Sequence, residues 1–226
     1  MRNIKRQSKP ISLTNNAITW TKELMDEIYN CSLTGSKVEE KFYSKYNKAD
    51  IKEALITMYN NLCCYCESKI GTTDYSHIEH RKPKRSKDGV PKVPYPELTY
   101  DWGNLHLACT KCNTAKGTKF DTINPILDAV SDIPIEDHFT YTKGVDGINW
   151  TPCSLQGSTT ELHADLNREP LPTIRLNILA NVILILKEIK DNPANPSNAV
   201  ALREVKKKIK EPYGSLVQFL LKSFEK

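Results

Sequence analysis

Two C-x-x-C pairs constrain the fold of this 226-residue chain more than any other feature. Cys63 and Cys66 form the first pair, Cys109 and Cys112 form the second, and the 42 residues of segment 67–108 separate them. Four thiolates in two such pairs are a typical ligand set of a structural Zn²⁺. The separation exceeds that of a compact zinc ribbon. We therefore predict a four-cysteine zinc site that joins the two ends of a folded segment.

The remaining cysteines argue against a disulfide framework. The total of seven is odd, and the basic N-terminal sequence lacks the apolar stretch of a secretory signal. In a reducing compartment, close cysteine pairs bind metal more often than they form disulfides. Cys64 could replace Cys63 only in a shorter C-x-C pair, so Cys63 is the preferred ligand. Cys31, Cys64 and Cys153 are interpreted as spare thiols, and a cytoplasmic location is expected.

Composition excludes two classes of protein. With 39% hydrophobic and 26% charged residues, the chain has the content of a globular protein rather than a disordered one. The most apolar run, 178–186, is far shorter than the roughly 20 residues of a membrane-spanning helix. The net charge of 32 − 27 = +5 permits contact with a polyanion but does not require it.

The patterning divides the chain into four segments. Residues 1–62 are predicted to be a helical N-terminal segment, because Trp20, Leu24 and Ile28 recur at four-residue steps after the candidate caps Asn15 and Asn16. Residues 63–125 are rich in Cys, His, Pro and Lys, with a short strand predicted before Cys109 and a short helix after it. Segment 126–172 is predicted to be irregular, with a possible hairpin at its Asp-Gly turn signal. Residues 173–226 are predicted to be helical, beginning with a helix whose wide apolar face is well buried.

Chemistry-bearing residues lie between and after the cysteine pairs. Glu79 precedes His80, and in a strand two neighbours can share one site only at a strand end or a twist. Asn113 follows the second pair, and its amide oxygen with the Glu79 carboxylate would suit a Mg²⁺-like ion. His80 would then be the general base for an attacking water.

Taken together and in this order, these motifs resemble the HNH endonucleases. The resemblance rests on C-x-x-C, Glu-His-x-x-Pro, an Asn in the connecting loop, and C-x-x-C-N-x-x-K-G. It extends to the PtuB-type HNH nuclease subunits of the Septu anti-phage system and their retron-associated relatives, over about residues 60–185. That family often has Phe where Arg81 stands.

The resemblance implies an α+β protein in which a zinc-stapled ββα-metal nuclease core is embedded in mainly helical flanks. It implies a DNA nuclease in which Glu79 and Asn113 bind a catalytic divalent ion, with Mg²⁺ as the expected ion and Mn²⁺ as the alternative. His80 would be the base, Asn104 would orient the loop and the His80 backbone, and Lys116 would meet phosphate, with Lys119 as a second candidate. It also implies a partner, an ATPase of the SMC/ABC type.

Several alternatives remain open at this stage. His77 and His106 compete with the proposed site residues. The loop after His80 is rich in basic residues and would either bind phosphates or be a solvated loop without a partner. The candidate nucleic-acid contacts in this loop and after the second cysteine pair are Arg81, Lys82, Lys84, Arg85 and Lys119. The zinc unit could also be a catalytically inactive module that binds nucleic acid or protein, or belong to an autonomous HNH nuclease. The joint presence of Glu79, His80, Asn104 and Asn113 favours the enzyme, because a scaffold needs only the cysteines.

Overall fold

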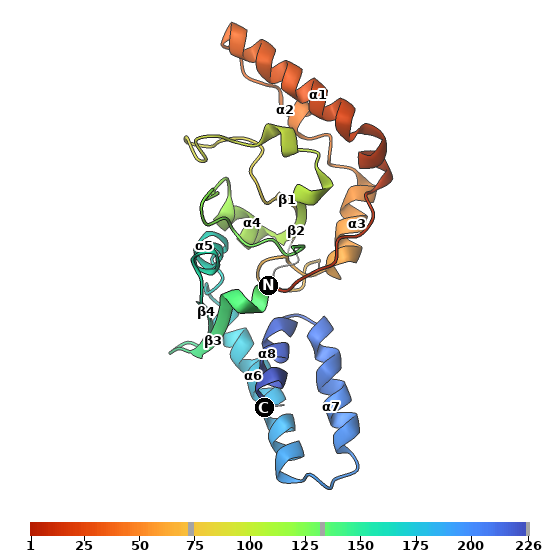
Figure 1. The fold of residues 1–226 in the computed structure, drawn as a ribbon, viewed down its shortest axis with the longest axis vertical. Helices are drawn as coiled ribbons and strands as arrows, with labels where there is room; N and C mark the ends of the chain where they lie inside the picture. Colours follow the sequence, from red (N-terminus) through yellow and green to blue (C-terminus); the bar gives the residue numbers. More distant parts are fainter. Residues whose placement is uncertain (72–74, 132–133, 225–226) are drawn as a thin grey trace.

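In the computed structural model the chain is elongated, with α1 near one end and a group of C-terminal helices at the other (Figure 1). The structure describes residues 1–71, 75–131 and 134–224. A small two-stranded sheet and helix α4 lie between the two helical ends. The described elements agree with the predicted α+β class, a small mixed centre within mainly helical flanks.

The N-terminal flank consists of α1 (Ile11–Thr34), α2 (Glu40–Tyr43) and α3 (Ala49–Tyr59). Helix α1 begins directly after Pro10, so the predicted caps at Asn15 and Asn16 were wrong. Proline has a backbone angle fixed near that of a helix start and lacks the amide proton that an entering helix leaves unpaired. Asn16 instead donates from its amide to the Ser12 carbonyl, 2.9 Å away. The helix ends at Gly35, whose φ of 67° is left-handed.

Strands β1 (Ser76–His80) and β2 (Leu105–Cys109) pair antiparallel, and α4 (Thr110–Lys116) follows β2 directly. The register places Ser76 opposite Cys109 and His80 opposite Leu105. Every residue of β2 is buried. The long connection between the strands contains two short 3₁₀ turns, η1 (Pro96–Leu98) and η2 (Trp102–Asn104). This ββα unit has the order that the sequence predicted.

Segment 126–172 is more regular than its prolines predicted. After η3 (Ile135–His138), strands β3 (Phe139–Lys143) and β4 (Ile148–Pro152) form the expected hairpin. An unexpected helix, α5 (Leu155–Ala164), follows, and the Ser154 hydroxyl caps it by accepting from the Gly157 amide at 2.9 Å. Small side chains line its buried face, which carries no strong apolar stripe, so apolar periodicity missed the helix.

The C-terminal flank packs around a second, separate core (Figure 1). Its helices are α6 (Leu171–Asp191), α7 (Asn198–Lys207), the 3₁₀ turn η4 (Lys208–Lys210) and α8 (Gly214–Phe224). Val182 and Leu186 of α6 are buried there, whereas Ile183 and Leu184 are 44% and 66% exposed. The apolar face of α6 is therefore narrower than its sequence predicted. None of the described helices is long and apolar enough to cross a membrane.

Candidate functional site

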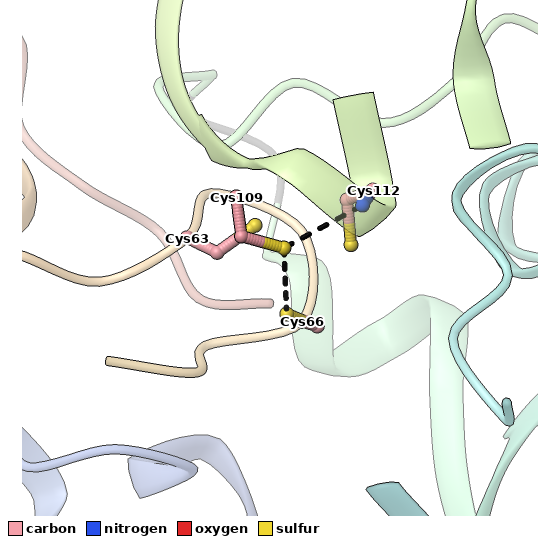
Figure 2. Close-up of side chains that lie close together, drawn as sticks. All are labelled: Cys63, Cys66, Cys109 and Cys112. Atoms are coloured by element: carbon pink, nitrogen blue, oxygen red, sulfur yellow. Dashed lines mark hydrogen bonds between the residues drawn. The ribbon is translucent and has the colours of Figure 1, made fainter. Parts of the chain in front are cut away.

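The four predicted zinc ligands converge on one point (Figure 2). Their sulfur atoms all lie within 4.8 Å of one another, and all four side chains are buried. The Cys66 and Cys109 sulfurs are 3.8 Å apart. That separation matches the roughly 3.8 Å between sulfurs in a tetrahedral site with Zn–S bonds of about 2.3 Å. The donor set is soft, closed and complete, so these residues fit a structural zinc, and Cys63 rather than Cys64 belongs to it.

A buried carboxylate follows the first cysteine pair. Glu67 is 1% exposed and accepts hydrogen bonds from the Met1 amino group (2.6 Å) and from Arg2 (2.8 Å). Burial alone would raise the pKa of this carboxyl, but those two cations lower it, to about 2. It also accepts from the Ser215 amide, so it joins the metal-binding loop to α8. Nothing in the sequence pattern marked Glu67 for this role.

His80 is the last residue of β1, the strand-end position at which a neighbouring pair can share one site. Its Nε2 lies 2.9 Å from the Thr99 carbonyl oxygen. A carbonyl only accepts, so Nε2 carries the proton and Nδ1 has the free lone pair. Burial, reinforced by the Lys84 ammonium, lowers the pKa of the imidazole to about 3. The ring is therefore neutral at physiological pH and packs edge-on against Tyr46, with centroids 4.7 Å apart.

Glu79 forms a buried ion pair with Lys116. The Lys116 ammonium is 2.6 Å from Glu79 Oε1, and the Tyr65 hydroxyl donates to the same oxygen at 3.2 Å. Lys116 also donates to the His80 carbonyl at 2.9 Å. This lysine was expected at a phosphate, but its side chain is fully buried and joins the end of α4 to the end of β1.

Asn104 fixes the loop that leaves β1. Its Oδ1 accepts from the Lys82 amide at 2.7 Å, and its Nδ2 donates to the carbonyls of Lys82 (2.9 Å) and Leu98 (3.2 Å). An asparagine is suited to this position because one side chain supplies both a donor and an acceptor. Asn104 was expected to hold the His80 backbone, but its side chain contacts the backbone of Lys82 and Leu98, and it is Lys116 that contacts the His80 carbonyl.

Asn113 lies on α4, three residues before Lys116. Residues at that spacing lie on neighbouring parts of one helix face, and the Lys116 side chain already reaches Glu79. The Asn113 side chain is partly exposed, and its amide makes no hydrogen bond to the described parts of the chain. Among the described residues, an ion pair joins Lys116 to Glu79, and no hydrogen bond joins Asn113 to it.

The predicted basic contacts divide into two groups. Arg81 donates to the Ile126 carbonyl, and Lys84 donates to the Tyr43 carbonyl and the Tyr46 hydroxyl, so both already have protein partners. Arg85 pairs with Glu40 at the surface. Of the other two, Lys82 lies over the Tyr95 ring, and the exposed Lys119 donates to the Ala115 carbonyl within its own segment.

The two competing histidines have structural partners. His77 Nε2 lies 3.1 Å from the Thr110 hydroxyl. His106, opposite Glu79 in the sheet, places Nδ1 2.7 Å from the Tyr59 hydroxyl. Its Nε2 is buried and points toward Asp128, 3.8 Å away. The residues that sequence reasoning missed, Tyr46, Tyr65 and Thr99, act through ring packing, a hydroxyl or a backbone carbonyl, and no motif marks such contacts.

Comparison with known proteins agrees with this geometry. The model of the HNH endonuclease family matches residues 63–119. The Septu protein PtuB of Bacillus thuringiensis is 33% identical over 165 residues, which cover 71% of this chain and 52% of that protein. The Septu protein PtuB of Bacillus mycoides (strain KBAB4) is 37% identical over 76 residues, 31% of this chain and 26% of the relative.

The chain thus spans about half the length of the first of these relatives. No solved structure gives a significant match. The family match begins at the first zinc ligand, and it includes Glu79, His80, Asn104, Asn113 and Lys116. Residues 63–119 of this chain therefore match the HNH endonuclease family, and the chain is similar over 71% of its length to the Septu protein PtuB of Bacillus thuringiensis.

Proposed function

We propose that this chain is a metal-dependent endonuclease that hydrolyses DNA phosphodiester bonds. The observation that carries the proposal is the state of His80: a neutral imidazole with Nε2–H bound to the Thr99 carbonyl and Nδ1 free to accept a proton. A general base needs this protonation state and a fixed orientation. Its neighbour Glu79 supplies a carboxylate at the same strand end.

Glu79 and Asn113 are the residues proposed to hold the catalytic divalent ion. Both described contacts of the Glu79 carboxylate are made by Oε1, so Oε2 is the oxygen proposed as the metal ligand. Carboxylate and amide oxygens are hard donors suited to Mg²⁺ or Mn²⁺. When bound, such an ion would polarise the scissile phosphate and stabilise the leaving oxygen.

In this proposal His80 Nδ1 takes a proton from the water that attacks the phosphorus atom in line with the leaving 3′ oxygen. The products are a 5′-phosphate and a 3′-hydroxyl. The Thr99 carbonyl stabilises the imidazolium through Nε2–H after the proton is transferred. Asn104 and Lys116 are positioning residues, because they hold the backbone at Lys82 and at His80.

DNA and an ATPase of the SMC/ABC type are the proposed partners, in a bacterial anti-phage complex. The relationship to the Septu protein PtuB supports the defence role. Lys82, which lies over the Tyr95 ring, and the exposed Lys119 are the proposed phosphate contacts. Arg81, Lys84 and Arg85 already contact protein, so in this proposal they shape the site and add to its positive potential.

Plasmid cleavage tests the proposal. The purified chain is assayed with Mg²⁺ and with Mn²⁺, with and without the co-expressed ATPase, beside His80→Ala and the matched control His77→Ala from the same strand. We expect His80→Ala to lower cleavage by about 10²–10⁴-fold, the usual contribution of a general base. His77→Ala should cut at the normal rate.

Two results would count against this function. A His80→Ala variant that cuts as fast as the unchanged chain would remove His80 as the base. Absence of cleavage in every arm, with zinc bound and the fold intact, would favour the inactive zinc-binding module. An RNA substrate in parallel reactions distinguishes that second result from a different nucleic-acid target.

A further inference from the structure

The Arg168 guanidinium lies against the cysteine cluster. Its Nη1 is 3.4 Å from the Cys112 sulfur, and its Nη2 is 3.7 Å from Cys109 and 3.9 Å from Cys66. One arginine thus contacts three of the four sulfurs. It belongs to the turn after α5 and lies 49 residues beyond position 119, where the match to the HNH family ends.

The local backbone holds this guanidinium in place. Helix α5 ends at Ala164 and is followed by its C-terminal cap Asp165, whose left-handed φ of 50° turns the chain back. Arg168 Nη1 donates to the Asp165 carbonyl at 2.7 Å and to the Ala164 carbonyl at 3.1 Å. Helix α5 in turn packs on α4, which carries Cys112. These contacts therefore hold the Arg168 guanidinium in a fixed position next to the sulfurs.

The charge of the centre explains why a cation there matters. Four thiolates around one Zn²⁺ carry −4 + 2 = −2, and all four cysteines are buried. A buried net charge is costly unless hydrogen bonds or opposite charges offset it. Among the described residues, the Cys112 amide, 3.5 Å from Cys109, and the Ser68 hydroxyl, 3.1 Å from Cys66, also contact the sulfurs, but neither carries a charge. Arg168 adds a full positive charge and a planar set of N–H donors.

We propose that Arg168 is an outer-shell residue of the zinc centre that stabilises the bound thiolates and so retains the metal. Residues that hydrogen-bond to metal ligands typically contribute 10–100-fold to metal affinity. The HNH segment then supplies the four zinc ligands, while Arg168, which lies outside that segment, offsets the negative charge of the zinc–thiolate centre. This inference concerns zinc retention and is independent of the proposed nuclease reaction.

Zinc release to a colorimetric chelator tests the proposal on the full zinc-loaded chain. Arg168→Ala is compared with the unchanged chain and with Asn167→Ala. Asn167 is the matched control because it bonds to the Trp150 backbone and to Arg175, and so supports the same junction without contacting a sulfur. We expect Arg168→Ala to release zinc at least about 10-fold faster than either.

The control separates the two explanations of a faster rate. If Arg168 acts only by capping α5, Asn167→Ala and Arg168→Ala variants of equal thermal stability should release zinc equally fast, and the proposal is overturned. A rate equal to that of the unchanged chain overturns it as well. Arg168→Gln provides the same comparison if the alanine variant does not fold, because its amide can still donate to a carbonyl while the charge is gone.

Cobalt substitution gives a second readout that needs no release kinetics. N–H···S hydrogen bonds withdraw electron density from thiolates, so their loss should shift the cobalt–thiolate charge-transfer band of Arg168→Gln to lower energy. Asn167→Ala should leave the band in place. An unchanged band in Arg168→Gln would contradict a contact between this guanidinium and the metal-bound sulfurs.

Discussion

The two ends of the β1–β2 sheet carry two different kinds of site. At the end where Ser76 faces Cys109, four sulfur atoms from two short sequence motifs form a compact ligand set. At the other end, His80 and Glu79 depend on groups from elsewhere in the chain: the Thr99 carbonyl, the Tyr46 ring and the Lys116 ammonium. The ligand residues alone specify the first site. The second site depends on neighbouring groups that fix the positions of His80 and Glu79.

This difference has an energetic side. Zinc binding is linked directly to folding, because the ligand set does not exist in the unfolded chain. At the His80 end, breaking the buried ion pair by removing one partner would cost about 3–5 kcal/mol, and the buried neutral imidazoles reduce the free energy of unfolding only as the pH falls. Loss of a zinc ligand should therefore affect the whole domain, and changes at the other end should be local and smaller.

The largest effect is expected for Cys112→Ser. Structural zinc contributes an apparent free energy of about 10–16 kcal/mol in small zinc domains, which is comparable to the whole stability of a domain. We expect this variant to lose stoichiometric zinc and its cooperative thermal transition, measured by metal analysis and circular dichroism. Cys153→Ser is the control, because Cys153 is exposed and outside the cluster. A Cys112→Ser variant with the same thermal transition as the unchanged chain would contradict the expectation that loss of a zinc ligand destabilises the whole domain.

The next effect is expected for Lys116→Met. It leaves the Glu79 carboxylate buried without its cation, a change that typically costs about 3–5 kcal/mol. Urea unfolding of the zinc-loaded chain measures the loss, and Lys119→Met, at an exposed lysine beyond the end of α4, is the control. Adding Glu79→Gln to Lys116→Met should restore part of the stability. If Lys116→Met lowers the free energy of unfolding no more than Lys119→Met does, the Glu79–Lys116 ion pair does not stabilise the His80 end of the sheet.

The smallest effect is expected from the pH dependence at His106, which pairs with Glu79 in the sheet. Burial, reinforced by the Arg6, Arg81 and Lys116 cations, holds the pKa of His106 well below 6.5. Below pH 6.5 the unfolded chain therefore binds a proton that the folded chain does not. The free energy of unfolding should fall by at most about 1.4 kcal/mol per pH unit for this group, or about 2 kcal/mol at pH 5.

Urea unfolding at pH 7.5 and pH 5 measures this slope, and His106→Asn should make it shallower. His80 adds to the slope with the same sign, because its pKa is also lowered, to about 3. The slope should thus decrease in His106→Asn without disappearing. An identical slope in the variant and the unchanged chain would show that His106 is not the buried neutral group that the structure describes.

The two ends also differ in how well the sequence predicted them. The cysteine quartet could be found from spacing alone, because C-x-x-C pairs present their thiolates at fixed distances. Glu79, His80 and Asn104 could be found only as a combination of motifs. The burial of Lys116 could not be predicted, because a lysine after a metal-binding pair looks the same in sequence whether it faces phosphate or a carboxylate.

Helical flanks were predicted where apolar side chains recur strongly, and errors arose where they do not. Helix α5 was missed because Gly157, Thr160 and Ala164 form its buried face. A Cβ at Gly157 would lie 2.5 Å from the His138 carbonyl oxygen, so close backbone contact rather than an apolar stripe holds this helix. Arg168, which follows it, had no sequence signal because its contacts to sulfur depend on that packing.

The pairing register of β1 sets the distance between the zinc-binding end of the sheet and His80. Four residue steps, about 13 Å at about 3.3 Å each, separate Ser76, opposite a zinc ligand, from His80 at the far end. A one-residue slip would send every side chain of the strand to the other face. Zinc binding at the Cys109 end therefore fixes the strand register and, with it, the position and direction of the His80 side chain at the other end. Insertions in the long connection between the strands should be tolerated far better than a single residue added within β1.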